Sequence, residues 1–293
     1  MPTLRDIRQR IASVKNTQQI TRAMKLVAAA KLRRAQERIL SARPYATKMG
    51  EVLADLTAAG GPKTHPLLAG REAASGTRKL LVVISADRGL CGGFNANIIR
   101  RSLEILRGSP EAALALVVIG RKARDFYRRR GHAAVRNEYV NILEKLTYAQ
   151  AAEIAQSLIQ AYLDEGLDEV VLVYNEFKST AVQRVVTRRL LPVETRAEAD
   201  QDAAEEFLFE PSAEAVLARL VPRHVEVQVY RALMESLAAE YGARMTAMEN
   251  ATRNAGEMIE MLTLQFNKVR QERITKELLE IVGGAEALRQ AGG

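Results

Sequence analysis

The residues best suited to chemistry in this 293-residue chain form a glycine-rich segment, SADRGLCGGFN, at positions 85–95. A glycine-rich loop between a strand and a helix can bind phosphate, because its backbone N–H groups converge on the anion. This segment contains neither the G-x-G-x-x-G pattern nor a P-loop with its Lys and Ser/Thr. The sequence therefore favours a structural turn, in which glycines allow positive φ and close packing. Asp87 beside Arg88 can pair as acid and base, but such neighbours are more often solvated or cap a turn.

The remaining reactive residues are few and scattered. Cys91 is the only cysteine and cannot form an internal disulfide, and His65, His132 and His224 have no metal-ligand spacing. The sequence contains no Ser/His/Asp set, carboxylate dyad or Cys/His arrangement. We therefore expect no catalytic residue, no metal and no cofactor.

The C-terminal part of the chain has the periodicity of one long helix. Between Met245 and Val282, apolar residues recur at steps of three and four, with charges between them. Traced backwards, the stripe reaches Pro222, and we expect it to stop at Gly283 and Gly284. Such a helix has about 62 residues and is roughly 90 Å long at 1.5 Å per residue. It needs a partner helix of similar length, because no compact domain can bury it along its whole length.

The N-terminus supplies such a partner, predicted from Thr3 to Ala58 with a capping box at Thr3 and Asp6. Its apolar stripe is interrupted by three polar residues, Gln18, Thr21 and Lys25, and then resumes. Across this gap the apolar character lies on a rotated face, formed by Ile20, Met24 and Val27. The matching lengths predict an antiparallel pair with the C-terminal helix. A homodimeric coiled coil, in which each helix pairs with its own copy, stays an alternative.

Between the two long helices the pattern changes to short apolar strands alternating with helices. Strands are predicted at 80–85, 114–119, 133–139, 170–177 and 182–191, and helices at 95–107, 121–130 and 146–165. This alternation predicts a mostly parallel sheet covered by helices. The predicted fold is thus an α/β domain inserted between two long N- and C-terminal helices that form an antiparallel coiled coil.

The domain boundaries follow from these elements and from composition. We predict an N-terminal coiled-coil helix at 1–58, a loop or linker at 59–77 and a Rossmann-like α/β domain at 78–193. An acidic connector with a short helix follows at 194–221, and the C-terminal coiled-coil helix occupies 222–293. The linker is predicted from its Gly, Pro, Ala and Thr content.

Charge is distributed unevenly along the chain. The net charge is +8, and residues 1–58 contain 12 Lys and Arg against 4 Asp and Glu, whereas residues 194–214 contain 1 against 8. A basic helix can bind nucleic acid, acidic lipid or an acidic protein surface, and charge alone does not choose among them. No run of 18 apolar residues predicts a membrane span, and the basic N-terminus has no apolar segment typical of a targeting peptide.

Three stretches together resemble a known family. They are IRQRIASVKNTQQITRAMKLVAAAKLRRAQ near the start, the SADRGLCGGFN turn, and FNKVRQERITKELLEIVGGAEAL near the end. In this order, across essentially the whole chain, they look like the gamma subunit of F-type ATP synthase. The resemblance implies a central rotor shaft whose coiled coil stands inside a ring of three alpha and three beta subunits, with the α/β domain near the membrane c-ring. It implies torque transmission between proton flow and ATP synthesis, without covalent chemistry on this chain.

The resemblance also implies the partners and the location. We expect one copy per complex, in contact with alpha, beta and epsilon subunits and the c-ring, with no nucleic acid and with membrane attachment only through the complex. The expected location is peripheral, on the cytoplasmic side of the bacterial inner membrane. The plastid branch has a regulatory cysteine pair, which a chain with only Cys91 cannot form.

Partner-contact residues are carried over by position. Met24, Lys25 and Arg244 match the site beside the acidic lever loop of beta. The polar group that meets a catch loop of beta is matched by Arg270, Gln271, Thr275 and Glu277. The tip that enters an apolar collar is matched by Leu278, Leu279, Ile281 and Val282, and the foot near the c-ring by Phe207, Phe209 and Glu210.

Two other functions stay open from the residues alone. A nucleotide-binding α/β protein with coiled-coil dimerisation arms would bind phosphate at the glycine-rich turn. A nucleic-acid-binding protein would use the basic N-terminal helix, although that helix must also bury an apolar stripe.

Overall fold

The computed structural model describes residues 3–58, 65–69, 78–108, 114–130, 135–180, 182–194 and 212–291, with side chains to residue 285 at the C-terminal end. The chain divides into two compact units. The first unit combines Met1–Val27 with Ala247–Gly293, and the second is Ala28–Thr246. Both units contain parts of two long helices, α1 (Leu4–Ala58) and α5 (Ala213–Ala291).

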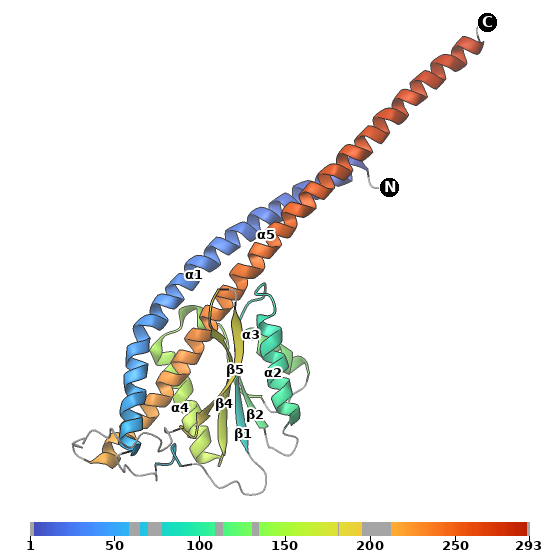
Figure 1. Cartoon of the computed structure of the whole chain (residues 1–293). Helices are drawn as coiled ribbons and strands as arrows, with labels where there is room; N and C mark the ends of the chain where they lie inside the picture. The colour runs from blue at the N-terminus through green and yellow to red at the C-terminus, as the bar shows by residue number, and fades with distance from the viewer. Residues whose placement is uncertain are drawn as a thin grey trace. The chain divides into compact units, whose positions relative to one another are not determined.

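The second unit contains a five-stranded sheet in the order β3-β2-β1-β4-β5 (Figure 1). The strands are β1 (Lys79–Ile84), β2 (Leu114–Ile119), β3 (Val135–Tyr139), β4 (Glu169–Phe177) and β5 (Gln183–Leu191). The first four strands are parallel, and β5 is antiparallel to β4. The predicted mostly parallel sheet is confirmed, and the bounds of its strands and of the helices between them differ from the predicted ones by at most two residues.

Alternating side chains of the strands pack on two different layers. Leu81 and Val83 face a core shared with α2 (Phe94–Gly108) and α3 (Arg121–Arg129). Leu80 and Val82 face a larger core shared with α4 (Tyr148–Asp164), α1 and α5. Since both faces are covered, the central strands β1, β2 and β4 read as continuous apolar runs rather than as alternating patterns. A short 3-10 helix, η1 (Leu143–Lys145), precedes α4.

Helix α4 begins where a complete capping box forms. The Thr147 hydroxyl accepts a hydrogen bond from the backbone N–H of Gln150, and the Gln150 side chain accepts one from the N–H of Thr147. This arrangement satisfies two of the N–H groups that a helix start leaves unpaired. The helix then buries Ile154, Leu158 and Tyr162 against the sheet.

The apolar stripe predicted for α1 is the buried stripe of the helix. In the second unit it includes Leu32, Ala35, Leu53 and Leu56, each at most 4% exposed. They pack in one core with the α5 residues Val221, Val225, Val229 and Leu233. Full burial of one such leucine side chain stabilises the fold by about 1.5–3 kcal/mol, so this stripe holds both long helices on the sheet.

Both predicted ends of the C-terminal helix were wrong. Helix α5 begins at Ala213, after the Ser212 hydroxyl accepts the N–H of Ala215, and it continues through Pro222. Val221 and Val225 are fully buried on either side of this proline, and their packing offsets the hydrogen bond that proline cannot donate. The helix also continues past Gly283 and Gly284 to Ala291, because neither glycine adopts the positive φ of a helix stop.

Part of the predicted linker at 59–77 is anchored. Residues 65–69 form a turn in which the His65 carbonyl accepts the N–H groups of Leu68 and Ala69. Leu67 is 2% exposed within the larger core, and its carbonyl accepts the N–H of Val193. Most of the predicted acidic connector, 195–211, lies outside the described residues.

Within the described part of the chain, no helix has a stretch long and apolar enough to cross a membrane. The same residues contain no group of three or more His, Cys, Asp and Glu side chains that could hold a metal ion.

The turn from β2 to α3 depends on Gly120, which has φ 94°. A Cβ at this position would overlap the carbonyl group of Ser85 at the end of β1. We predict that Gly120→Ala lowers the free energy of unfolding of the sheet by at least ~3 kcal/mol, from strain and overlap together. Hydrogen exchange of the β1 and β2 amides in the full chain measures this loss.

Gly108 is the matched control, because a Cβ there meets no atom within 4 Å. Gly108→Ala should change the same free energy by no more than ~1 kcal/mol. Equal effects of the two substitutions would contradict the assigned role of Gly120.

Candidate partner-contact sites

In the first unit α1 and α5 run antiparallel. The guanidinium of Arg8 lies 5.5 Å from the ring centroid of Phe266, and further along α1 the Lys25 ammonium lies 2.7 Å from a carboxylate oxygen of Glu249. As residue numbers rise on α1, those of their partners on α5 fall. The predicted antiparallel pairing of the two terminal helices is confirmed.

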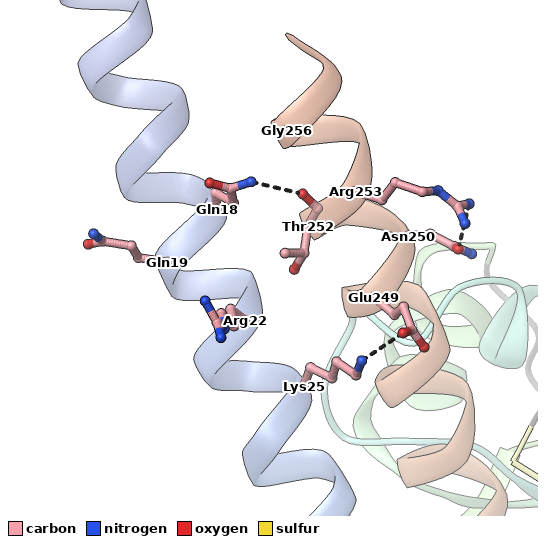
Figure 2. Close-up of a pocket in the computed structure, with 9 residues that line it drawn as sticks. All are labelled: Gln18, Gln19, Arg22, Lys25, Glu249, Asn250, Thr252, Arg253 and Gly256. Carbon is pink, nitrogen blue, oxygen red and sulfur yellow. Dashed lines mark hydrogen bonds and ion pairs between the residues drawn. The ribbon is translucent and has the colours of Figure 1, made fainter. Parts of the chain in front are cut away.

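The interruption in the α1 stripe forms a polar layer between the helices, made by Gln18, Thr21 and Lys25 of α1 with Glu249 and Thr252 of α5. Figure 2 shows two of its contacts, from Gln18 to Thr252 and from Lys25 to Glu249. The hydroxyl oxygens of Thr21 and Thr252 lie 2.8 Å apart, and each hydroxyl also contacts a carbonyl of its own helix. Thr21 is only 8% exposed. Polar groups buried in this way fix the register of two helices, because a shift would leave them unpaired.

The predicted rotated apolar face does not fill this gap. Ile20 and Val27 are 59% and 56% exposed, and Met24 is half-buried. The polar side chains themselves complete the contact between the helices, since they reach hydrogen-bond partners on α5.

An open polar groove of about 620 Å³ lies over the polar layer. Besides Gln18, Lys25, Glu249 and Thr252, it is lined by Gln19, Arg22, Asn250, Arg253 and Gly256. Three basic side chains and one acidic side chain line it, so its charge favours an acidic partner. The pKa of Glu249 is lowered mainly by the hydrogen bond from Lys25 and, to a smaller extent, by the positive charge of that ammonium group. The one acidic side chain that lines the groove is therefore kept ionised.

Arg244 belongs to the second unit and is held inside it. Its guanidinium lies 2.7 Å from the Glu240 carboxylate and donates a hydrogen bond to the carbonyl of Gly89 in the glycine-rich turn. The Arg244 side chain is 12% exposed. Burial raises the pKa of Glu240, while Arg244 partly opposes this shift. The expected role of Arg244 beside Met24 stays a prediction.

The glycine-rich turn is closed by these contacts rather than open to a ligand. Gly92 has φ 57°, as predicted for a structural turn, and Leu90 also has a positive φ of 63°. In sheets of this strand order, ligands bind beyond the carboxyl ends of the strands where the order reverses, here β1 and β4. At that place α5 packs Gly242 towards Phe177 of β4 and bonds Arg244 to Gly89. The cavity beside the turn measures about 80 Å³, well below the roughly 300 Å³ or more typical of sites for drug-sized ligands.

The other predicted partner-contact residues lie on α5 or outside the described part. Arg270, Gln271, Thr275 and Glu277 are exposed, and Glu277 forms an ion pair with Arg273 at 2.7 Å. The predicted tip is also exposed, with values from 56% to 68% for Leu278, Leu279, Ile281 and Val282. The predicted foot residues Phe207, Phe209 and Glu210 lie outside the described residues.

The sequence is similar to known proteins along almost its whole length. A family model described as ATP synthase matches residues 3–288. The ATP synthase gamma chain of Pelotomaculum thermopropionicum is 51% identical over 288 residues, which cover 98% of this chain and 100% of that protein. The ATP synthase gamma chain of Geotalea uraniireducens is 49% identical over 291 residues, with coverage of 99% and 100%.

The chain belongs to the gamma-chain family of ATP synthase. A chain in the central stalk and c-ring structure of Tetrahymena thermophila mitochondrial ATP synthase is 30% identical, with a TM-score of 0.60 over 79% of this chain and 99% of that chain. A chain in the Euglena gracilis mitochondrial OSCP/F1/c-ring structure has a TM-score of 0.69 over 99% of this chain and 96% of that one. At 21% identity this second likeness shows a shared fold.

For this gamma-family chain, sequence reasoning missed the residues that complete the sites. Thr252 and Glu249 of the polar layer, and Glu240 beneath Arg244, were not predicted. A partial signal was present for the first two: the polar gap at Gln18, Thr21 and Lys25 marks the level at which polar partners can lie on the facing helix, although it does not identify them. Glu240 carried no such signal, because a glutamate between apolar helix positions reads as a solvated residue.

The polar layer generates a prediction about pairing. Thr21→Val and Thr252→Val should each lower the free energy of unfolding by ~1 kcal/mol, since each removes one member of a buried hydroxyl pair. The double variant should lose less than the sum of the two single losses, because two methyl-bearing side chains pack against each other. Hydrogen exchange of the α1 and α5 amides around this layer measures all three variants, and additive losses would contradict the pairing.

Glu240 generates a prediction about pH. Because its folded pKa lies above its ordinary value of 4.5, its stabilising contribution is present below that value and is lost as pH rises through the folded pKa. Arg244, Asp87 and Lys31 are the charged groups that act on it. Wild type should therefore lose stability relative to Glu240→Gln between about pH 4 and neutrality.

The comparison requires unfolding curves of the two full-length chains across this pH range. A difference in stability that is constant with pH, or that grows in favour of wild type towards neutrality, would contradict the assignment.

Proposed function

We propose that this chain is the central rotor shaft of a proton-translocating F-type ATP synthase. The observation that carries the proposal is the near-complete match to ATP synthase gamma chains, at 51% identity over 98% of the chain. Torque passes along α1 and α5 between the membrane c-ring and the catalytic beta subunits. The chain itself is non-catalytic and belongs to the complex that makes or hydrolyses ATP.

The paired helices suit this role physically. Torque along a single helix can be lost by local unwinding, whereas two antiparallel helices joined by buried contacts resist it together. The polar layer adds specific partners at one level of this pair, namely Thr21 with Thr252 and Lys25 with Glu249.

The partner contacts of the first unit follow from charge and exposure. The basic groove beside Met24 and Lys25 meets an acidic lever loop of beta. Arg244, in the second unit, is a separate candidate contact for the same loop. Arg270, Gln271, Thr275 and Glu277 meet the catch loop of beta. The exposed apolar residues from Leu278 to Val282 enter an apolar collar, since exposed apolar patches of this kind mark interaction sites.

The remaining contacts complete the assembly. Phe207, Phe209 and Glu210 contact the c-ring, and the chain also contacts the epsilon subunit. The chain lies on the cytoplasmic side of the bacterial inner membrane and is held there through the complex.

The proposal predicts one copy of this chain per complex. A shaft inside a threefold ring cannot share the symmetry of the ring, so only one copy fits its axis. Affinity purification from membranes through a tag on this chain, followed by mass measurement and subunit identification, tests this. Two or more copies, or co-purification without ATP synthase subunits, would overturn the proposal.

The basic groove predicts a coupling defect for Met24→Lys. The substitution adds a positive charge beside Lys25, so the chain should bind the acidic loop of beta too strongly at one rotational position. Over-stabilising one such position by ~1.4 kcal/mol slows escape from it about tenfold. We expect ATP synthesis to fall more than ATP hydrolysis in membrane vesicles, with partial relief by high salt.

Two variants are matched controls. Met24→Leu changes packing without charge, and Ile20→Lys adds the same charge one turn earlier at a position that is already 59% exposed. Both should leave the ratio of synthesis to hydrolysis near that of wild type. The same defect in Met24→Leu would show that packing, not charge, governs this position.

A further inference from the structure

Helices α2 and α3 form a strongly basic layer on one face of the sheet in the second unit. They pack on the side of Leu81 and Val83, whereas α4 packs on the other side (Figure 1). We call residues 94–108 and 121–130, both fully described, the basic layer. It contains nine Lys and Arg against two Asp and Glu, an excess close to the net charge of +8 of the whole chain.

Helix stability does not explain where these cations lie. The last turn of a helix favours positive charge because of the helix dipole, and Arg107 and Arg129 occupy such positions. Arg121 and Lys122, however, lie in the first turn of α3, where the dipole disfavours positive charge. Since the layer is basic at the unfavourable end as well, its charge is better explained by an external partner.

Most of the positive charge is not neutralised inside the fold. Eight of the nine cations are exposed. The two acidic side chains contact Arg101 and Arg124 of the layer itself, at 3.1 and 2.7 Å, and Arg128 forms two hydrogen bonds with Glu138 of β3. Four further cations have no ion pair in the described part of the chain, namely Arg100, Arg107, Lys122 and Arg129.

The basic layer has no apolar anchor. Within its two described ranges no large apolar side chain is exposed, and Phe94, Ile98 and Tyr127 are buried beneath the surface. Specific protein interfaces usually centre on apolar or aromatic anchors that become buried on binding. A surface without such an anchor suits a partner that is recognised by charge.

The type of cation favours phosphate as the partner group. Eight of the nine are Arg, whose planar guanidinium donates two parallel hydrogen bonds to a phosphate. The half-buried ring of Phe126 is covered by the guanidinium of Arg130, 4.7 Å from the ring centroid, so it is not free to stack on a nucleic-acid base. Lipid headgroups need no stacking platform, and anionic headgroups attract clustered Lys and Arg.

Three of the cations lie at the end of the layer that is opposite to the glycine-rich turn. Helices α2 and α3 each connect two parallel strands, so their C-terminal ends lie beside the amino ends of the strands. Arg107, Arg129 and Arg130 are at these ends. Arg244, the candidate beta contact of the second unit, bonds to the turn at the other end. In the proposed assembly beta and the membrane lie at opposite ends of the shaft, so the arginine end is the one nearer the membrane.

We propose that the basic layer binds the headgroups of anionic phospholipids at the membrane surface, through its arginine end. This inference rests on the proposed function for the presence of a membrane, and the contact adds to the attachment of the chain through its complex. A fluid lipid surface presents the same average charge at every angle. Binding to it therefore favours no single rotational position, whereas a fixed acidic protein would favour one.

The test measures co-sedimentation of the full-length chain with phosphatidylcholine vesicles and with vesicles of equal parts phosphatidylcholine and phosphatidylglycerol. Wild type should bind the anionic vesicles at least roughly tenfold more tightly than the neutral ones. The triple variant Arg107→Gln, Arg129→Gln, Arg130→Gln should bind the anionic vesicles at least roughly tenfold more weakly than wild type.

The matched control is the triple variant Arg33→Gln, Arg34→Gln, Arg38→Gln. It removes the same charge from exposed positions of α1 in the same unit. Its binding to the anionic vesicles should stay within roughly threefold of wild type, because charges away from the contact are screened.

A second measurement uses the assembled complex in anionic vesicles. Cys91 is buried, so a fluorophore can be attached selectively at Arg129→Cys or, as a control, at Arg34→Cys. A quencher on the headgroup of phosphatidylglycerol should quench the label at position 129 more than the label at position 34.

Four results would overturn the proposal. They are equal binding of wild type to the two kinds of vesicle, equal losses in the two triple variants, tighter binding to duplex DNA than to anionic vesicles at equal phosphate concentration, and equal quenching of the two labels. The first and third do not depend on whether any variant folds. None of the four bears on the proposed function, which fails when ATP synthase subunits do not co-purify with the chain.

Discussion

The antiparallel pairing of α1 with α5 is the constraint on which the other features depend. Neither helix can bury its apolar stripe alone, and each unit meets this need with the other long helix. In the second unit the stripes share a core with the sheet, through Leu32, Leu53, Val225 and Leu233. The described residues of the first unit form no sheet, so the two helices contact each other directly, with Ile7, Met248 and Ala255 buried.

The different packing of the long helices in the two units explains why each unit contains the polar pairs it does. Within the first unit a purely apolar contact between two helices would permit sliding, because many registers bury similar areas. The hydroxyl pair of Thr21 and Thr252 and the ion pair of Lys25 and Glu249 favour one register. In the second unit the sheet already fixes the helices, and polar pairs serve a different purpose: Arg244 and Glu240 close the turn that follows β1. In other sheets of this strand order a ligand crevice lies at this point. In this chain helix α5 closes it through Arg244.

Most of the architecture could be predicted from the sequence because it depends on periodicity. Burial in a core is the dominant cause of both patterns: the apolar steps of three and four in α1 and α5, and the apolar runs of β1, β2 and β4. The ends of α5 could not be predicted from local signals, since tertiary packing of Val221 and Val225 carries the helix through Pro222. Likewise, Leu67 lies in a segment with the composition of a linker, and only its burial in the larger core shows that the segment is anchored.

The candidate sites were less predictable than the fold. Periodicity marks a gap at Gln18, Thr21 and Lys25, but it does not say whether the gap is filled by rotated apolar residues or by polar partners. Which answer holds depends on the facing residues of α5, 224 positions away for Lys25. The roles of Met24, Arg270 and the exposed apolar residues near Val282 depend on other chains, so no property of this chain alone determines them.

Direct observation of rotation tests the central claim most sharply. Cys91 is 2% exposed, so a single exposed cysteine introduced by Lys122→Cys can be labelled selectively with a probe on this chain. With the purified complex immobilised through its beta subunits and supplied with ATP, the account predicts that the probe rotates in one direction, at a rate that follows ATP hydrolysis. Sustained hydrolysis with a stationary probe would contradict it.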